Sequence, residues 1–508
     1  MELVIKNLGP IKGNQQSINL SKKFFIFLGY NNSGKTYVSQ LLWTIFNQDK
    51  HIKFIKSTFS DGILEEQVFD KSYLDGWRIE LTQSLLDSIL EKFVLFLQKE
   101  IFTVYNQDQL NSELDKTSFI LKATVNDFIG TQITTIVTID FPGKRELGYS
   151  LKTSRLQITK SANDLVLYIK RIKLSDEVEK DCIRLHYGEN SPELVSRKQS
   201  FVILAILQII LNMSIGFKHG KLSSTVQFFL PASRAFFSIF YTYIYEIERN
   251  KAEEDRRLIS EITSIEEIRK KIFRRSYTEP VNQAIEALYE LNHNPSSLGL
   301  YNSRLIELAE IMKGDIILDR VEGIGPIQFS FRFKENKQEI DLPMYLASSS
   351  ANQLTLLYLY LKYWAREKGN FLIIDEPEVN LHPENQIKLL DLLINFVNQS
   401  DNKVLIATHS PLLADAVNNY LYIDKLRQDY NDKQIKQIIT DNRLKYLYPD
   451  TKLSTEDLGV YFFNDKGKII DYNSDDYWIN FTNFRSVKED LYESGKILTN
   501  YIYYKENE

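Results

Sequence analysis

A phosphate-loop pattern near the start of the chain constrains the fold more than any other feature of the sequence. The eight residues from Gly29 to Thr36 follow the pattern G-x-x-x-x-G-K-T, directly after the apolar run Phe24 to Leu28. Such a loop wraps phosphates with backbone N–H groups, while its lysine neutralises them and its hydroxyl reaches Mg²⁺. The sequence therefore predicts a nucleoside triphosphate site formed by Gly29, Asn31, Asn32, Ser33, Gly34, Lys35 and Thr36.

A second motif is an apolar strand that ends in two carboxylates. The run Phe371 to Ile374 is followed by Asp375 and Glu376. A buried strand delivers its last residues to the carboxyl edge of a parallel sheet, where a phosphate loop also lies. We expect Asp375 to hold Mg²⁺ together with Thr36, and Glu376 to polarise the attacking water. The alternative is a strand end capped by two solvated acids.

A third motif is another short apolar strand, which ends in His409. The ring of this histidine is expected to contact a γ-phosphate and to stabilise the charge that builds on the transferred group. Its Thr and Ser neighbours also suit a turn, so a purely structural histidine is the alternative.

The fourth motif is a serine-rich segment before a long apolar helix, Leu354 to Trp364. Hydroxyls and free N–H groups at the start of a helix form an anion site. Serine is also a favoured helix cap, which is the plainer interpretation. The residues concerned are Ser348, Ser349 and Ser350.

The order of these four motifs resembles the ABC-type ATPase heads of structural-maintenance-of-chromosomes (SMC) proteins, double-strand-break repair ATPases and overcoming-lysogenisation (OLD) proteins. The chain is more similar still to the bacterial AAA-family ATPases of anti-phage systems, which include the PtuA subunit of Septu. Four short islands carry the resemblance: Ile5 to Lys12, Phe229 to Arg234, Asp375 to Pro383 and Asp457 to Phe463.

This resemblance implies an α/β fold, namely an ABC-type (P-loop) ATPase head with a flanking antiparallel β segment and a helical insertion. It also implies ATP and Mg²⁺ as cofactors, and a serine-rich signature that acts in trans on the nucleotide of a second copy. Such signatures usually carry a glycine where this chain has Ser350. The departure bears on ATP-driven dimerisation and turnover rather than on nucleotide binding, because serine still presents a hydroxyl and an N–H.

Four regions are expected along the chain. Residues 1–175 form an N-terminal ATPase lobe with the phosphate loop, and residues 176–315 form a helical insertion or arm. Residues 316–425 form a C-terminal ATPase lobe with the signature, the Asp-Glu strand and the His strand, and residues 426–508 form an extension. Runs rich in β-formers predict antiparallel strands that flank the nucleotide-binding sheet; they are Phe119 to Val125, Gln132 to Phe141, Leu151 to Ile158 and Leu165 to Ile172.

Composition bounds the compartment and the partners. The net charge is -5, so no chain-wide basic field attracts nucleic acid, and any contact with DNA must be local. The single cysteine, Cys182, excludes an internal disulfide and fits a reducing compartment. Lys6 and Lys12 interrupt the apolar start, which argues against a signal peptide. We expect a cytoplasmic protein without membrane contact, in which Phe201 to Phe217 is a buried or partner-facing helix.

The tail of the chain does not predict a nuclease. A Toprim nuclease would need paired carboxylates such as D-x-D to hold two metals, and none occurs beyond Pro411. Asp475 and Asp476 are adjacent, and on an extended strand they would point to opposite faces. The six histidines and one cysteine supply no HNH or zinc-ligand cluster. An effector on a separate protein is therefore implied.

Three weaker signals stay open at this point. Arg234 could bring a cation near the γ-phosphate or a DNA path, and a surface salt bridge explains it about as well. Gln227 is a candidate for the metal-sensing glutamine of ABC-type heads. The basic run Arg269 to Arg275 could grip DNA phosphates, although nearby glutamates favour a solvated helix face.

These observations lead to one expected function and one alternative. The expected function is an ATP-hydrolysing switch that forms a homodimer or higher homo-oligomer around ATP. By resemblance, it controls a separate effector protein, a nuclease, in bacterial anti-phage defence. The alternative is a DNA-binding repair or recombination ATPase that clamps or tethers DNA, with nucleic acid as its partner. An ABC-transporter subunit and a nucleotide-gated scaffold with negligible turnover are ranked lower.

Overall fold

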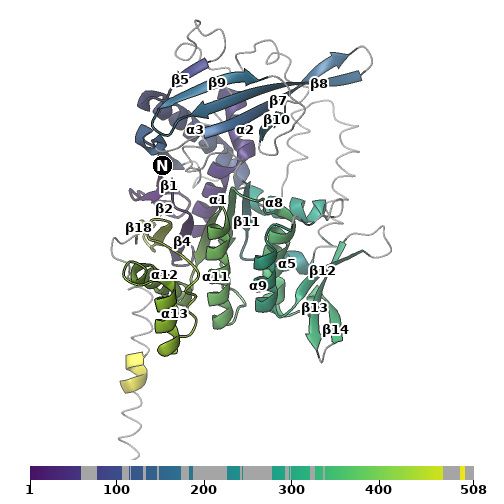
Figure 1. Ribbon diagram of the computed structural model, residues 1–508, viewed down its shortest axis with the longest axis vertical. Coiled ribbons are helices and arrows are strands. Elements are labelled where there is room, and N and C mark those ends of the chain that lie inside the picture. The colour runs from purple at the N-terminus through teal and green to yellow at the C-terminus, as the bar shows by residue number, and fades with distance from the viewer. Residues whose placement is uncertain are drawn as a thin grey trace, which may run out of the picture.

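A six-stranded sheet, covered by helices on both faces, carries the motifs found in the sequence (Figure 1). The computed structural model describes residues 1–58, 77–105, 114, 116–129, 133–145, 148–172, 182–186, 226–240, 243, 277–291, 297, 299–320, 327–335, 338–472 and 492–497. Its mixed sheets and helices confirm the predicted α/β class.

The central sheet has the strand order β11-β15-β16-β4-β17-β18. Its strands are β4 (Phe24–Gly29), β11 (Val226–Leu230), β15 (Asn370–Asp375), β16 (Lys403–Thr408), β17 (Leu458–Phe463) and β18 (Ile469–Asp471). All neighbours pair in parallel except β18, which runs antiparallel to β17. The three apolar runs that the sequence marks as strands are therefore adjacent, and their carboxyl ends meet at one edge.

Alternate side chains of β4 pack into two separate cores. Phe25 and Phe27 belong to the core on one face, with helices α1 (Lys35–Phe46) and α3 (Gln83–Val104). Phe24, Ile26 and Leu28 belong to the core on the other face. A strand buried on both faces reads as a continuous apolar run, which is why the sequence shows no alternation here.

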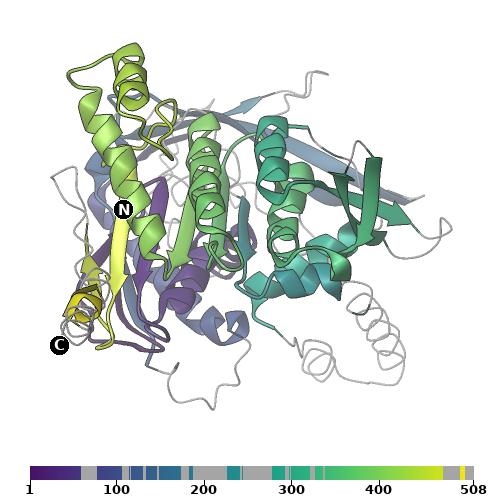
Figure 2. The same cartoon turned by 90° about the horizontal axis from the view of Figure 1, so that it is seen from below.

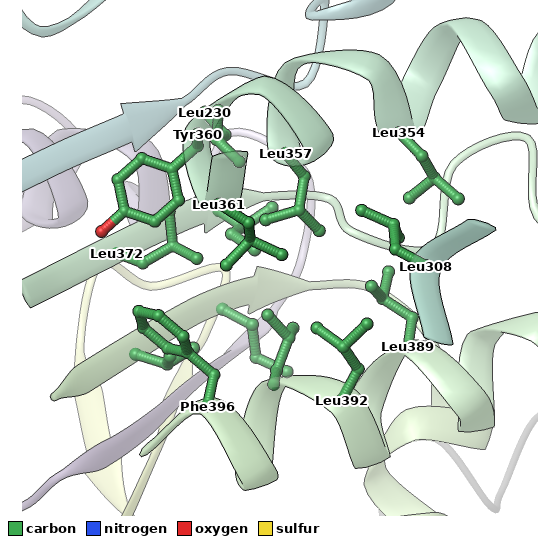
Figure 3. Packing of buried hydrophobic residues seen from close by; sticks show 14 of the residues in the cluster. Leu230, Leu308, Leu354, Leu357, Tyr360, Leu361, Leu372, Leu389, Leu392 and Phe396 are labelled. Carbon is green, nitrogen blue, oxygen red and sulfur yellow. The ribbon is translucent and has the colours of Figure 1, made fainter. Parts of the chain in front are cut away.

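Helices that pack over the other face of the sheet fill the second core. Among the described residues they are α5 (Ala235–Ile239), α8 (Glu279–Glu290), α9 (Asn302–Met312), α10 (Ser349–Leu359), α11 (Pro383–Gln399) and α12 (Pro411–Leu426). Figure 2 shows α11 and α12 lying side by side over this face. In Figure 3, Tyr360 and Leu361, in a π-helical turn (Tyr360–Trp364) that continues α10, pack with Leu372 of β15 and Phe396 of α11.

Within the described ranges, three smaller sheets accompany the central one. The first contains β1 (Glu2–Leu8), β2 (Ile11–Lys12), β3 (Ser17–Asn19) and β6 (Ser118–Lys122). The second has the order β10-β7-β8-β9-β5, with β5 (Trp77–Glu80), β7 (Ile133–Arg145), β8 (Gly148–Lys160), β9 (Val166–Ile172) and β10 (Cys182–His186). The third contains β12 (Asp315–Arg320), β13 (Ile327–Glu335) and β14 (Gln338–Pro343).

The predicted β-rich runs form strands, and the pairs β5–β9, β7–β8 and β8–β9 are antiparallel as expected. One pair in the same sheet, β10 with β7, is parallel. The five-stranded sheet lies at the end of the molecule that carries β8 and β9 in Figure 1. It therefore flanks the central sheet rather than extending it.

The structure corrects two of the expected regional limits. Strand β11 falls within the range 176–315, which the sequence assigned to an insertion, but it pairs with β15 inside the central sheet. Strand β17 falls within the predicted extension 426–508 and pairs with β4 on the other side of the sheet. Both limits cut through the central sheet because strand pairing joins segments that are far apart in sequence.

Several expectations fall on residues outside the described ranges. They are the apolar segment Phe201 to Phe217, the basic run Arg269 to Arg275 and the pair Asp475 and Asp476. Among the residues that the structure does describe, none of the helices has the length and apolar character needed to span a membrane.

The close approach of β4 and β17 generates a test of the fold. A Cβ atom added at Gly29, whose φ is +146°, would lie 2.1 Å from the carbonyl oxygen of Phe463. We expect Gly29→Ala to lower the free energy of unfolding by about 3 kcal/mol, because backbone cannot move aside and the φ value strains any Cβ. Urea unfolding measures the loss. Gly495→Ala is the control, since nothing lies within 4 Å of its added Cβ, and equal stability of the two variants would contradict the packing.

Candidate functional site

The phosphate loop connects the end of β4 to the start of α1. Gly34 is the N-cap of α1 with φ +102°, and Asn32 has φ +59°. Positive φ values are tolerated by glycine and asparagine, which explains these residue types at these positions. A Cβ at Gly34 would approach Cγ1 of Ile11 to 3.0 Å, so the N-terminal β1–β2 hairpin packs against the loop. The free N–H groups at the start of α1 make this loop an anion site.

Lys35 lies inside the loop with only 5% of its surface exposed. Its Nζ donates to the carbonyl oxygens of Gly29 at 3.1 Å and Tyr30 at 2.8 Å. Burial lowers the pKa of Lys35 to about 8, against the opposing effect of nearby carboxylates, the largest from Asp375. At neutral pH the ammonium is charged, and it lies where a bound phosphate chain would pass.

Thr36 and Asp375 meet directly, although 339 positions separate them in sequence. The Thr36 hydroxyl donates to Oδ2 of Asp375 at 2.8 Å. Asp375 is 7% exposed, and burial raises its pKa to about 6 in spite of the Thr36 hydrogen bond. A hydroxyl and a carboxylate within hydrogen-bond distance are two hard oxygen ligands, so this pair fits Mg²⁺. The assignment of these two residues as metal ligands stays a prediction.

Glu376 follows Asp375 with an unusual backbone. Its φ is +49°, a region that residues other than glycine, asparagine and aspartate rarely occupy. Its N–H donates to the carbonyl oxygen of Ala407 at 2.7 Å, which ties the turn to β16. Its Oε1 lies 3.7 Å from Nε2 of His409, and both side chains are partly exposed, at 36% and 29%. The structure thus brings the proposed water-activating carboxylate and the histidine to the same spot.

His409 lies between the phosphate loop and the acids that follow β15. Burial lowers the pKa of His409, Lys35 lowers it further, and Glu376 and Glu378 oppose the change. The backbone of Gly29 in the phosphate loop is near enough to the ring to raise its pKa slightly. The ring is therefore neutral at pH 7 and offers one N–H donor and one acceptor.

Glu378 is a residue of this site to which the sequence reasoning assigned no role. Its Oε1 accepts from the hydroxyl of Thr408 at 2.7 Å and from the backbone N–H of His409 at 2.9 Å. Its Oε2 is buried and has no hydrogen-bond partner among the described residues. Glu378 thus fixes the backbone of His409. The sequence signal that could have indicated this role is the second glutamate in the run Asp375-Glu376-Pro377-Glu378. A tight turn after Glu376 can direct that second acid back toward the end of the strand.

The signature serines begin α10 as the sequence predicts. Ser348 is the N-cap, and its Oγ accepts from the N–H of Ala351 at 3.2 Å and lies 3.0 Å from Oγ of Ser350. Ser348 is therefore a helix cap, and its role as a signature residue stays a prediction. Ser348 and Ser349 are exposed on the surface. The Ser348 hydroxyl contacts the helix start and the Ser350 hydroxyl, and no hydrogen bond joins it to the phosphate loop among the described residues. Action of the three serines in trans stays a prediction.

Arg234 and Gln227 lie in places that the sequence did not predict. Arg234 is 1% exposed and bonds backbone carbonyls, so a surface salt bridge is the wrong explanation for it. Gln227 is 5% exposed and pairs with Phe371 at the beginning of β15. Because Asp375 lies at the opposite end of that strand, the structure does not bring Gln227 to the site.

The raised pKa of Asp375 predicts that the free energy of unfolding depends on pH, because the buried carboxylate destabilises the folded protein when it is ionised. Between about pH 4 and 6 the folded protein holds a proton that the unfolded chain releases, so stability falls as the pH rises through this window. We expect Asp375→Asn to be more stable than wild type by about 3 kcal/mol at pH 8, and the difference to shrink toward pH 4. Urea unfolding with a metal chelator present measures the difference.

The control for this pH series is an acid whose pKa is shifted in the opposite direction. Asp341 is exposed, and its hydrogen bond with Arg332 lowers the pKa of its carboxyl. Asp341→Asn is therefore expected to bring no gain in stability at pH 8. A gain for Asp375→Asn that stayed constant from pH 4 to pH 8 would contradict the buried, raised-pKa description of Asp375.

Comparison with known proteins gives results at two levels. A stretch of 75 residues, 15% of this chain, is 32% identical to the OLD nuclease of Thermus scotoductus, and it covers 14% of that relative. Among solved structures, the Smc head domain with an extended coiled coil from Pyrococcus furiosus, bound to the C-terminal domain of ScpA, has 10% identity and a TM-score of 0.31 over 96% of this chain and 98% of that one. A second SmcHead structure, bound to the C-winged helix domain of ScpA, has 12% identity and a TM-score of 0.30 over 82% and 90%.

The family is shown by a longer match. Residues 1–414, which span the phosphate loop, the Asp-Glu strand and the His strand, match the family described as AAA ATPase domain. This range is most of the 508 residues. The protein belongs to the AAA ATPase domain family and is an ATPase.

Proposed function

We propose that this ATPase is a nucleotide-driven switch, in which two copies pack head to tail around ATP and separate after hydrolysis. The observation that carries the proposal is the Thr36 to Asp375 hydrogen bond of 2.8 Å at the edge where three strands end. It joins the phosphate loop to the carboxylate strand, and Glu376 and His409 lie beside it.

The side chains have complementary roles in hydrolysis. The N–H groups at the start of α1 and the Lys35 ammonium bind the phosphates. Thr36 and Asp375 would hold Mg²⁺, which would neutralise part of the phosphate charge. The Glu376 carboxylate orients and deprotonates the attacking water, and the neutral His409 ring donates a hydrogen bond to the transferred group. Glu378 keeps His409 in place through its backbone N–H.

The surface around the signature supports assembly of two copies. Ser348 and Ser349 are exposed at the start of α10, and Tyr345 and Leu346 just before them are 69% and 59% exposed. A helix start with free N–H groups suits the γ-phosphate of a neighbouring copy, and exposed apolar side chains beside it suit a protein contact. Hydrolysis removes the shared phosphate and so weakens the contact, which gives a conformational signal.

We further propose that the signal controls a separate effector, a nuclease, in bacterial anti-phage defence, and that the protein acts in the cytoplasm. The resemblance to anti-phage ATPases supports this proposal, as does the 32% identity to an OLD nuclease over 75 residues. Within the described ranges no group of three or more His, Cys, Asp or Glu side chains is arranged to hold a metal ion. The net charge of -5 gives no general attraction for DNA, so we place the DNA-clamping alternative second.

Replacing the phosphate-loop lysine tests nucleotide binding. We expect Lys35→Ala to weaken ATP binding by roughly 10- to 100-fold, because charge-assisted hydrogen bonds to phosphate are lost. Titration calorimetry measures the affinity. Lys53→Ala is the control, because Lys53 is 58% exposed on α2 (Gln48–Thr58) and should leave affinity unchanged. Equal affinity of wild type and Lys35→Ala would remove the basis of the proposed site.

Replacing the glutamate separates binding from hydrolysis. We expect Glu376→Gln to lower kcat by about 100-fold or more and to accumulate an ATP-bound dimer, because the water is no longer activated. Light scattering with and without ATP measures the mass, and the double variant with Lys35→Ala should stay at the mass seen without ATP. A monomer in the single variant at saturating ATP would count against the switch. Filter binding of duplex DNA to the same variant would favour the alternative if the DNA is retained.

A further inference from the structure

Arg234 is a buried cation that connects two parts of the site. It lies in the turn after β11, with 1% of its surface exposed. An arginine side chain has five N–H donors in a planar fork. All five are directed at backbone carbonyl oxygens, which belong to Pro231, Gln353, Asp375, Glu376 and Pro377.

Three of these carbonyls surround the proposed water-activating residue. Nη1 donates to the oxygen of Asp375 at 2.7 Å, and Nη2 donates to those of Glu376 at 3.1 Å and Pro377 at 3.4 Å. The φ of Glu376 is +49°, a conformation that costs on the order of 1 to 3 kcal/mol in a residue with a side chain. Such a backbone persists only where its surroundings hold it, and the guanidinium supplies those contacts from one side.

The remaining side of the fork contacts the signature helix. Nε of Arg234 donates to the oxygen of Gln353 at 3.0 Å, in α10. In return, Nε2 of Gln353 donates to the oxygen of Ala232 at 3.1 Å, in the turn that carries Arg234. These two bonds run in opposite directions between the same two segments. The helix that begins at Ser348 is thereby fastened to the turn that holds Glu376.

The electrostatic setting keeps this arginine charged. Burial lowers the pKa of Arg234 to about 10, and Asp375, Glu378 and Glu376 oppose the change. The guanidinium is therefore protonated at neutral pH, beside three carboxylates. With every N–H already bonded, it cannot contact a phosphate without giving up a carbonyl.

We infer that Arg234 is a positioning residue: it fixes the backbone of Glu376 and couples that backbone to α10, so that the start of the signature helix and the hydrolytic carboxylate move together. The inference rests on the role proposed above for Glu376. A lysine would preserve the charge at this position but, as a single point donor, could not contact both segments at once.

The test is a double-mutant cycle in single-turnover ATP hydrolysis. We expect Arg234→Lys to lower the hydrolysis rate by roughly 10- to 100-fold while changing the affinity for ATP by less than about threefold. In the Glu376→Gln background the same substitution should change the remaining rate by less than about twofold, because residues that act as one unit are non-additive. A role confined to stability would not produce this non-additivity at temperatures where both proteins are folded.

A matched control is available at the far end of α12. Arg427 is 13% exposed, and its Nη2 donates to the backbone oxygens of Pro449 at 2.6 Å and Thr451 at 3.2 Å. It caps the end of α12, about 24 Å along the helix from His409. Arg427→Lys removes the same kind of contact and is expected to leave the hydrolysis rate within about twofold of wild type.

The outcomes separate this inference from the proposed function. If Glu376→Gln itself leaves the rate unchanged, the proposed role of Glu376 is wrong. The inference about Arg234, which rests on that role, is then wrong as well. If Glu376→Gln lowers the rate but Arg234→Lys is neutral, or adds its full effect in that background, the inference alone is overturned. Should Arg234→Lys fail to fold, Gln353→Met removes the return bond to Ala232 and is expected to lower the rate by about threefold to tenfold, again only when Glu376 is present.

Discussion

The parallel pairing of β15, β16 and β4 is the constraint on which the site depends. Register places Asp375 opposite Ala407 and Thr408 opposite Leu28, so that the three strands end together. A shift of one residue would move a strand end by about 3.3 Å, which is more than the Thr36 to Asp375 hydrogen bond tolerates. It would also draw Asp375 into an apolar layer. The apolar packing of the strands on both faces therefore determines the geometry of the polar edge.

The two buried cations at this edge bond backbone carbonyls, which leaves the carboxylates free to bind a metal ion or a water. Lys35 and Arg234 direct their N–H groups at backbone carbonyls rather than at the neighbouring acids. Asp375 accepts the Thr36 hydroxyl, and Oε2 of Glu378 lies buried without a hydrogen-bond partner among the described residues. Direct ion pairs would neutralise the acids and occupy the oxygens that a metal or a water needs. The arrangement instead leaves anionic oxygens for ligands and accepts the free-energy cost of burying them, which the raised pKa of Asp375 reflects.

Sequence reasoning succeeded where the signal is local. The phosphate loop, the acid-ended strand and the serine cap each combine a residue pattern with the element that carries it, so β4, β15, β16 and the start of α10 were predicted. It failed where a residue's role is set across the fold. Arg234 donates to the backbone carbonyl of Asp375, which is 141 positions away in sequence, and no local sequence pattern predicts this contact. Strands β11 and β17 were assigned to an insertion and an extension for the same reason, because pairing partners cannot be read from a single segment.

A switch needs a physical connection between the surface that meets its partner and the group that performs hydrolysis. In this chain the connection is short. Helix α10 starts at the exposed Ser348 cap and presents the Gln353 carbonyl to Arg234, which in turn bonds the carbonyl of Glu376. Coupling through such a path requires an element with two discrete arrangements. The backbone of Glu376 meets this requirement because its φ is positive, which is unfavourable for a residue with a side chain. If the contacts that hold this conformation are lost, the backbone is expected to change to a different, relaxed conformation. A turn that is already relaxed would only shift its position gradually.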